Sequence, residues 1–120
     1  MKSLFIFVLY FIALSGCAST SFGRVDLAKR AKTEMLGMSK IDLLQCAGVP
    51  DRVQKMEGME FLAYDSRSVY GGNGNVNTRH CEATFVLVDH AVMKISYTGS
   101  TGGLLTKDHQ CAYIIQNCLQ

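Results

Sequence analysis

The stretch "GMSKIDLLQCAGVPDR", residues 37–52, carries the clearest local structure signals in the chain. Ser39 is a good helix N-cap, and Asp42 three residues later completes a weak capping box. Gly48 stands where a helix end favours a left-handed residue, and Pro50 prevents the helix from continuing. The stretch therefore predicts a short helix that is bounded at both ends. Its inward-facing residues are expected to be Ile41, Leu44 and Cys46.

A second helix is expected just before this stretch, over Val25–Leu36. Its helix-forming residues include Ala28, Ala31 and Met35, which recur at helical spacing. Gly37 ends this helix. The two helices are therefore expected to form a hairpin or an L-shaped pair.

The chain after Pro50 is read mainly as strands. Two hairpins are expected, each closed by a two-residue turn, Glu57-Gly58 and Asp89-His90. The strands are Arg52–Met56, Met59–Ser66, Cys81–Val88 and Ala91–Thr98, with a glycine-rich loop over Arg67–Arg79 and a short terminal helix over Asp108–Leu119. This order predicts an α+β fold, with two N-terminal helices packed on one face of a three- to four-stranded antiparallel sheet.

The N-terminus has the features of a secretory signal peptide over residues 1–16. Lys2 precedes an apolar run, Leu4–Leu14, which is followed by small residues. The run has about 11 residues, whereas a membrane-spanning helix needs roughly 20. Leu14-Ser15-Gly16-Cys17 resembles a bacterial lipobox. The alternative is an ordinary cleavage site near Ala18 with an incidental cysteine.

The lipobox resemblance implies cleavage before Cys17, a diacylglycerol on its thiol and an acyl chain such as palmitate on its amine. Two or more chains make a stable anchor, since each buried CH₂ contributes about 0.8 kcal/mol. Residues 17–24 would then be a lipidated tether and residues 25–120 one domain. Ala18 is not the aspartate typical of inner-membrane retention, so the expected location is the periplasmic face of the outer membrane.

Composition excludes some classes of partner. Loss of Lys2 with the signal lowers the formal net charge from +2 to +1, and no block of like charges occurs. A balance this close to neutral does not point to nucleic acid.

The five cysteines predict two disulfides. If Cys17 carries lipid, the remaining four form an even set in an exported chain: Cys46, Cys81, Cys111 and Cys118. The alternative is that some are buried thiols. If Cys111 and Cys118 share a helix, their Cα atoms lie about 10.5 Å apart, beyond the roughly 7 Å that a disulfide tolerates. One would then bind Cys46 and the other Cys81, in either of two arrangements.

No pattern predicts catalysis, a metal or another cofactor. His80 adjoins Cys81, but neighbours on a strand point to opposite faces. No C-x-x-C motif occurs, and His80, Cys81, His90, His109 and Cys111 do not fall at a familiar zinc spacing. We therefore expect no catalytic residue and no metal ligand.

A surface loop is the remaining candidate site. The stretch "TGGLL" places two leucines after two glycines, and exposed leucines can anchor a partner. The candidate partner-binding residues are Gly102, Gly103, Leu104 and Leu105. The alternative is that the leucines fold under and cover one edge of the sheet. Tyr70 and the "GGNGN" loop form a weaker candidate.

Together, "LGMSKIDLLQCAGVPDR" and "FLAYDS" resemble the SmpA/OmlA (BamE-like) family of small outer-membrane lipoproteins. The matching residues are Gly37, Met38, Ser39, Leu43, Gly48, Pro50 and Tyr64. The resemblance implies two helices on a three-stranded antiparallel sheet and an accessory role in β-barrel assembly. The four cysteines and the C-terminal tail depart from that family's pattern.

The leading hypothesis is a lipid-anchored, non-enzymatic, protein-binding module of the outer membrane, an accessory factor in outer-membrane protein assembly. One alternative is a similar fold that serves another envelope complex, such as secretion machinery, or that inhibits a periplasmic enzyme. A second is a structural lipoprotein that supports envelope integrity through lipid contacts.

Overall fold

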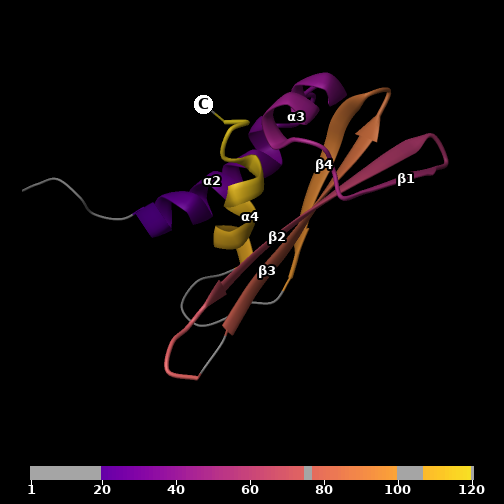
Figure 1. Cartoon of the computed structure of the whole chain (residues 1–120). Helices are drawn as coiled ribbons and strands as arrows, with labels where there is room; N and C mark the ends of the chain where they lie inside the picture. The colour runs from indigo at the N-terminus through magenta and orange to yellow at the C-terminus, as the bar shows by residue number, and fades with distance from the viewer. Residues whose placement is uncertain (1–19, 75–76, 100–106, 120) are drawn as a thin grey trace, which may run out of the picture.

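The computed structural model describes residues 20–74, 77–99 and 107–119 of the chain. Within these ranges two helices precede four consecutive strands, and one helix follows them (Figure 1). The elements are α2 (Thr20–Glu34), α3 (Lys40–Ala47), β1 (Arg52–Met56), β2 (Met59–Tyr70), β3 (Asn77–Val88), β4 (Ala91–Thr98) and α4 (Lys107–Ile115). No helix in the described ranges has the length and apolar character needed to cross a membrane.

The four strands form one antiparallel sheet in the order β1-β2-β3-β4. The β1–β2 and β3–β4 hairpins turn at Glu57-Gly58 and Asp89-His90, the two turns expected from the sequence. All four turn residues have positive φ, from 50° to 78°. Two-residue turns of this kind match the twist of the flanking strands. The hairpins are therefore determined by local chain geometry.

The core lies between one face of the sheet and the helices. Tyr64 and Phe85 meet edge-to-face, with ring centroids 5.4 Å apart. The Tyr97 hydroxyl donates to the Ala28 carbonyl of α2 at 2.8 Å, which joins β4 to that helix. The other buried apolar residues are Ala31, Met35, Leu43, Leu62, Cys81, Ala83, Leu87, Val92, Ile95, Cys111, Ala112 and Ile115.

The predicted arrangement of two N-terminal helices packed on one face of the sheet is wrong. Two helices precede the sheet in the chain and one follows it, and the following helix, α4, makes the most extensive helix contacts with the sheet, through β2 and β3. α2 crosses α4, packs against it and touches β4, whereas α3 meets α4 at fewer positions (Figure 1). The reason is long-range: α4 buries Cys111, Ala112 and Ile115, and a disulfide holds it to β3.

The helix α3 begins as predicted, but a different face is buried. The Asp42 amide donates to the Ser39 hydroxyl at 3.1 Å, and Gly48 ends the helix with φ 84°. Leu43 is fully buried, whereas Ile41, expected to face inward, is 67% exposed. An isolated bridge pairs Ser39 with Ala91. This pairing constrains the start of the helix and therefore which of its faces meets the core.

Several predicted boundaries differ from the structure. α2 begins at Thr20, so residues 20–24, expected in the tether, are helical. β2 continues to Tyr70 and β3 begins at Asn77, inside the expected loop. α4 ends at Ile115, so Cys118 lies beyond the helix.

Candidate functional site

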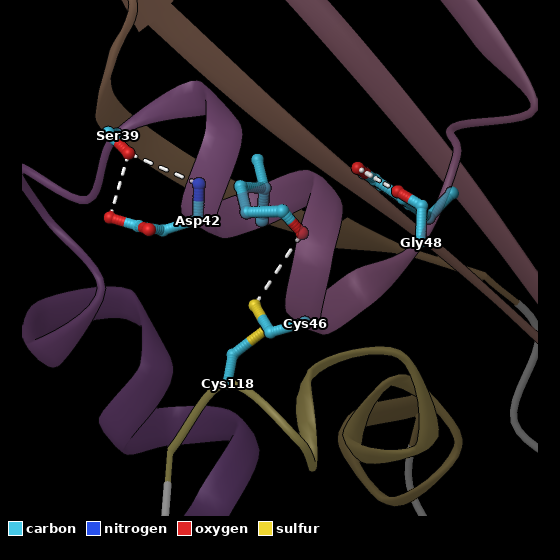
Figure 2. The surroundings of a disulfide bond; sticks show 7 residues. Ser39, Asp42, Cys46, Gly48 and Cys118 are labelled. Carbon is cyan, nitrogen blue, oxygen red and sulfur yellow. Dashed lines mark hydrogen bonds between the residues drawn. A yellow bond between two sulfur atoms is a disulfide. The ribbon is translucent and has the colours of Figure 1, made fainter.

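Two disulfides are present, as the cysteine count predicted. Cys46 pairs with Cys118, and Cys81 pairs with Cys111, with Cα atoms 5.0 and 5.2 Å apart. This is one of the two arrangements that the sequence left open. Figure 2 shows the first bond joining the end of α3 to the turn after α4. The sequence argument against a Cys111–Cys118 bond assumed that both residues share a helix. That bond is indeed absent, but Cys118 lies beyond the end of α4, so the assumption does not hold.

The two bonds hold α4 at its middle and just beyond its C-terminal end. Cys81 and Cys111 are fully buried, so their bond joins the middle of β3 to α4 inside the core. Gln110 of the same helix accepts from the Ser68 hydroxyl at 2.8 Å and donates to the Ser66 hydroxyl at 2.7 Å. These contacts position α4 against the second half of β2.

That half of β2 has a neighbour on one side only. β3 pairs with β2 from Met59 to Tyr70, but β1 pairs with it only from Met59 to Ala63. Among the described residues no strand continues the sheet beyond Ala63 on the β1 side. The edge from Asp65 to Val69 is therefore unpaired by backbone, and we call it the β2 edge.

A groove of about 280 Å³ lies beside the start of the β2 edge. Its apolar lining includes Val49, which is 87% exposed, and Tyr113 of α4, which is 42% exposed. Asp51 and Asp65 also line it, and none of its described lining residues is basic. Burial, with the nearby Asp51 carboxylate, raises the pKa of the Tyr64 hydroxyl to about 12. The groove therefore presents more polar than apolar surface, and the Asp51 carboxylate gives it a negative local charge.

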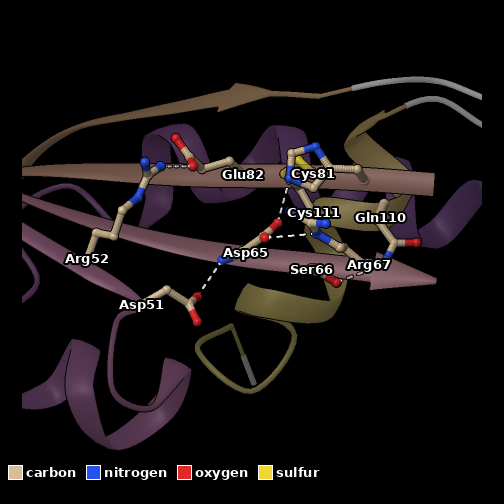
Figure 3. A network of polar contacts seen from close by, with 10 residues as sticks. Asp51, Arg52, Asp65, Ser66, Arg67, Cys81, Glu82, Gln110 and Cys111 are labelled. Carbon is tan, nitrogen blue, oxygen red and sulfur yellow. Dashed lines mark hydrogen bonds and ion pairs between the residues drawn. A yellow bond between two sulfur atoms is a disulfide. The ribbon is translucent and has the colours of Figure 1, made fainter. Parts of the chain in front are cut away.

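Asp65 is the centre of a polar network at the same place. Its backbone amide donates to the Asp51 carboxylate at 2.7 Å (Figure 3). Its own carboxylate accepts from Arg67 Nε at 3.0 Å and lies 2.6 Å from Nε2 of His80. The network fixes the backbone at the start of the β2 edge.

The sheet face opposite the core is not covered by any described helix. We call it the bare face. Strand alternation places Phe61 and Val86 on it as a register pair, both half-buried. A shallow hollow of about 150 Å³ lies beside Phe61, lined also by Arg52, Gln54, Ala63, Glu82 and Thr84. Arg52 and Glu82 form an ion pair across it (Figure 3).

The histidines and cysteines do not assemble into a reactive cluster in the described ranges. His80 binds Asp65, and its neighbour Cys81 has no free thiol because it is in a disulfide. No group of three or more His, Cys, Asp or Glu side chains among the described residues is placed to hold a metal ion. His109 is buried, and burial with nearby Arg24 and Arg79 lowers its pKa.

Five of the predicted site residues fall outside the part of the chain that the structure describes. Cys17 and the loop residues Gly102, Gly103, Leu104 and Leu105 lie outside the described residues. The β2 edge was missed because the glycine-rich sequence that follows it made Arg67–Arg79 look like a loop. Alternation of Ser66 and Ser68 with Asp65, Arg67 and Val69 was the available signal for a strand.

Comparisons with known proteins give no identification: no family model, no curated protein and no solved structure matches this chain.

Proposed function

We propose that this chain is a lipid-anchored, protein-binding module at the periplasmic face of the bacterial outer membrane. The lipobox-like Leu14-Ser15-Gly16-Cys17 supports the anchor. The two disulfides suit an oxidising compartment outside the cytoplasm. The function is binding, without catalysis.

The unequal covering of the sheet carries this proposal. Helices and disulfides stabilise one face, so the small domain does not need the other face for its core. The bare face presents half-buried Phe61 and Val86, and the β2 edge presents unpaired backbone groups. Apolar patches and unpaired strand edges are surfaces that proteins use to bind other proteins.

The partner class rests on the sequence resemblance alone. The stretch around Gly37-Met38-Ser39 and Pro50 resembles a family that assists β-barrel assembly. The proposed partner is therefore a subunit of the outer-membrane protein assembly machinery. Another envelope complex is the competing candidate.

The test is a mild-detergent pull-down of the full-length lipoprotein from membranes of its native host, with the bound proteins identified by mass spectrometry. Recovery of barrel-assembly subunits in stoichiometric amounts supports the whole proposal. Recovery of a different complex keeps the binding function and rejects the assembly role. Recovery of no protein, with cell integrity dependent on lipid composition, rejects the binding function in favour of a structural lipoprotein.

The anchor is tested separately with Cys17→Ala. We expect this variant to leave the membrane fraction or to remain unprocessed. Ser15→Ala is the matched control, since it keeps a small residue before Cys17 and should still be anchored. Membrane fractionation of Cys17→Ala that equals the wild type would reject lipidation.

A further inference from the structure

The β2 edge has the geometry to accept another strand. Residues Tyr64–Tyr70 lie beyond the last β1 pair and, at about 3.3 Å per residue, extend for roughly 23 Å. The Asp65 amide points to this edge, because it donates to Asp51, which lies just before β1. Backbone groups of alternate residues point the same way in an antiparallel strand. Arg67 and Val69 therefore direct their N–H and C=O groups to the unpaired side.

The edge is rigid before anything binds. Ser66 and Ser68, on the core side of β2, are held by Gln110 of α4. Cys81, the register partner of Ser66 on β3, is joined to Cys111 of the same helix. A strand whose backbone is already ordered pays less conformational entropy when another strand pairs with it.

The groove at the start of the edge selects a charge. Asp51 lines it together with apolar Val49 and Tyr113, and no described lining residue is basic, whereas the Asp65 carboxylate already meets Arg67 and His80. One oxygen of Asp51 accepts from the Asp65 amide, and the second oxygen has no hydrogen-bond donor among the described residues. A lysine or arginine fits such a site, because its methylene stem can pack on Val49 or Tyr113 while its charge meets the Asp51 carboxylate.

We propose that the β2 edge binds an extended segment of a partner protein by strand addition, and that the groove takes a lysine or arginine of that segment. This inference rests on the proposed protein-binding function and names its binding mode. Backbone hydrogen bonds to Arg67 and Val69 supply affinity for any extended chain, and the groove beside Asp51 supplies the preference for a basic residue.

The occupant is located by photo-crosslinking in native membranes. Benzoylphenylalanine replaces Val69 in one full-length variant and Met93, an equally exposed residue of β4, in the control. The expected result is a crosslink from position 69 alone to a partner segment that contains a basic residue. A crosslink to a second copy of this chain, to a helical segment, or equally from both positions would overturn the proposal.

The crosslinked segment, made as a synthetic peptide, then tests the backbone bonds. Arg67→Pro removes the outward N–H, which a strand edge tolerates, and should weaken peptide binding by about tenfold. Arg67→Gln loses the same charge but keeps the N–H, so it should stay within about threefold of the wild type. Equal binding by both variants would overturn strand addition.

The groove is tested with Asp51→Asn, which keeps an oxygen for the Asp65 amide and removes the charge. Peptide binding should weaken about three- to tenfold, and a lysine-to-glutamine change in the peptide should add little further loss. If the losses caused by Asp51→Asn and by the change in the peptide simply add, the basic residue of the peptide does not bind at Asp51. If Arg67→Pro fails to fold by thermal melting, Asp51→Asn and the crosslinks still decide the proposal.

The outcomes separate the two proposals. A partner found by pull-down that crosslinks from benzoylphenylalanine at position 61, on the part of the bare face where β1 pairs with β2, and not from position 69 keeps the protein-binding function and rejects the β2 edge. Recovery of no partner in the pull-down rejects both.

Discussion

The two faces of the sheet hold similar side chains in different surroundings. Phe85 and Phe61 lie on neighbouring strands and point to opposite faces, because Phe61 pairs with Val86 and Leu62 with Phe85. Phe85 is fully buried beneath the helices, whereas Phe61 is half-buried on the bare face. The comparison indicates that stability is concentrated on the covered face, which leaves the bare face available for binding.

The largest expected effect separates these two phenylalanines. Phe85→Ala should lower the free energy of unfolding by about 4 kcal/mol, because it removes a fully buried ring and leaves a cavity. Phe61→Ala should lower it by about 1 kcal/mol or less, because that ring is already partly exposed to water. Urea denaturation of the oxidised domain measures both. Equal losses would mean that the bare face is part of the stabilising core.

A second effect concerns the disulfide that lies at the margin of the covered face. Cys46 and Cys118 are half-buried, and their bond joins residues 72 positions apart in the sequence. The buried Cys81–Cys111 bond joins residues only 30 positions apart. Cys46→Ala with Cys118→Ala should lower the free energy of unfolding by about 3 kcal/mol, because the unfolded chain regains the freedom of a long loop.

The two bonds should also differ in their response to reductant. Mild dithiothreitol with mass-spectrometric thiol counting should reduce Cys46–Cys118 first, because the other pair is enclosed by the core. If Cys81–Cys111 is reduced first, then α4 separates from β3 more readily than the turn at Cys118 separates from α3.

Much of the fold follows from local sequence signals. The Ser39 cap, the Glu57-Gly58 and Asp89-His90 turns, and the bounds of β1 and β4 agree with the structure. These features depend on residues close together in the chain. The position of α4 depends on Cys81, which lies 30 residues from its partner, and no local pattern could reveal that α4 covers the sheet.

The site was less predictable than the fold. The sequence pointed to the four cysteines and to the leucines at 104 and 105, which lie outside the described residues. The β2 edge depends on the difference in length between β1 and β2, which is a property of the sheet. Ser66 and Ser68 looked like loop residues because Gln110, their partner in the core, is more than 40 positions away.

A third prediction uses the pH response of the covered face. The His109 ring is buried beside Arg24 and Arg79, and its Nδ1 has no hydrogen-bond partner in the described part of the chain. Burial and these positive charges lower the pKa of His109 below the ordinary 6.5. Near and below that pH, the unfolded chain therefore binds a proton at His109 more readily than the folded chain does. The free energy of unfolding is therefore highest above about pH 6.5 and decreases as the pH falls below that value.

Thermal melting across pH 5 to 8 measures this response. His109→Gln should flatten the decrease in melting temperature on the acid side, because glutamine is polar and does not titrate. His90→Gln is the control, since His90 is exposed in a turn. If His90→Gln flattens the curve as much as His109→Gln, the buried ring is not the cause.

The smallest expected effect lies on the bare face. The Arg52–Glu82 ion pair has side chains 64% and 25% exposed, whereas Lys40–Glu60, which joins α3 to β2, has 27% and 12%. Water and salt screen exposed charges, so a double-mutant cycle to alanine should give a coupling of about 0.5 kcal/mol for Arg52–Glu82 and a larger one for Lys40–Glu60. Urea denaturation at low and high salt measures both couplings. A coupling of about 2 kcal/mol at Arg52–Glu82 would show that the bare face contributes to folding, and its charges would then be less free to meet a partner.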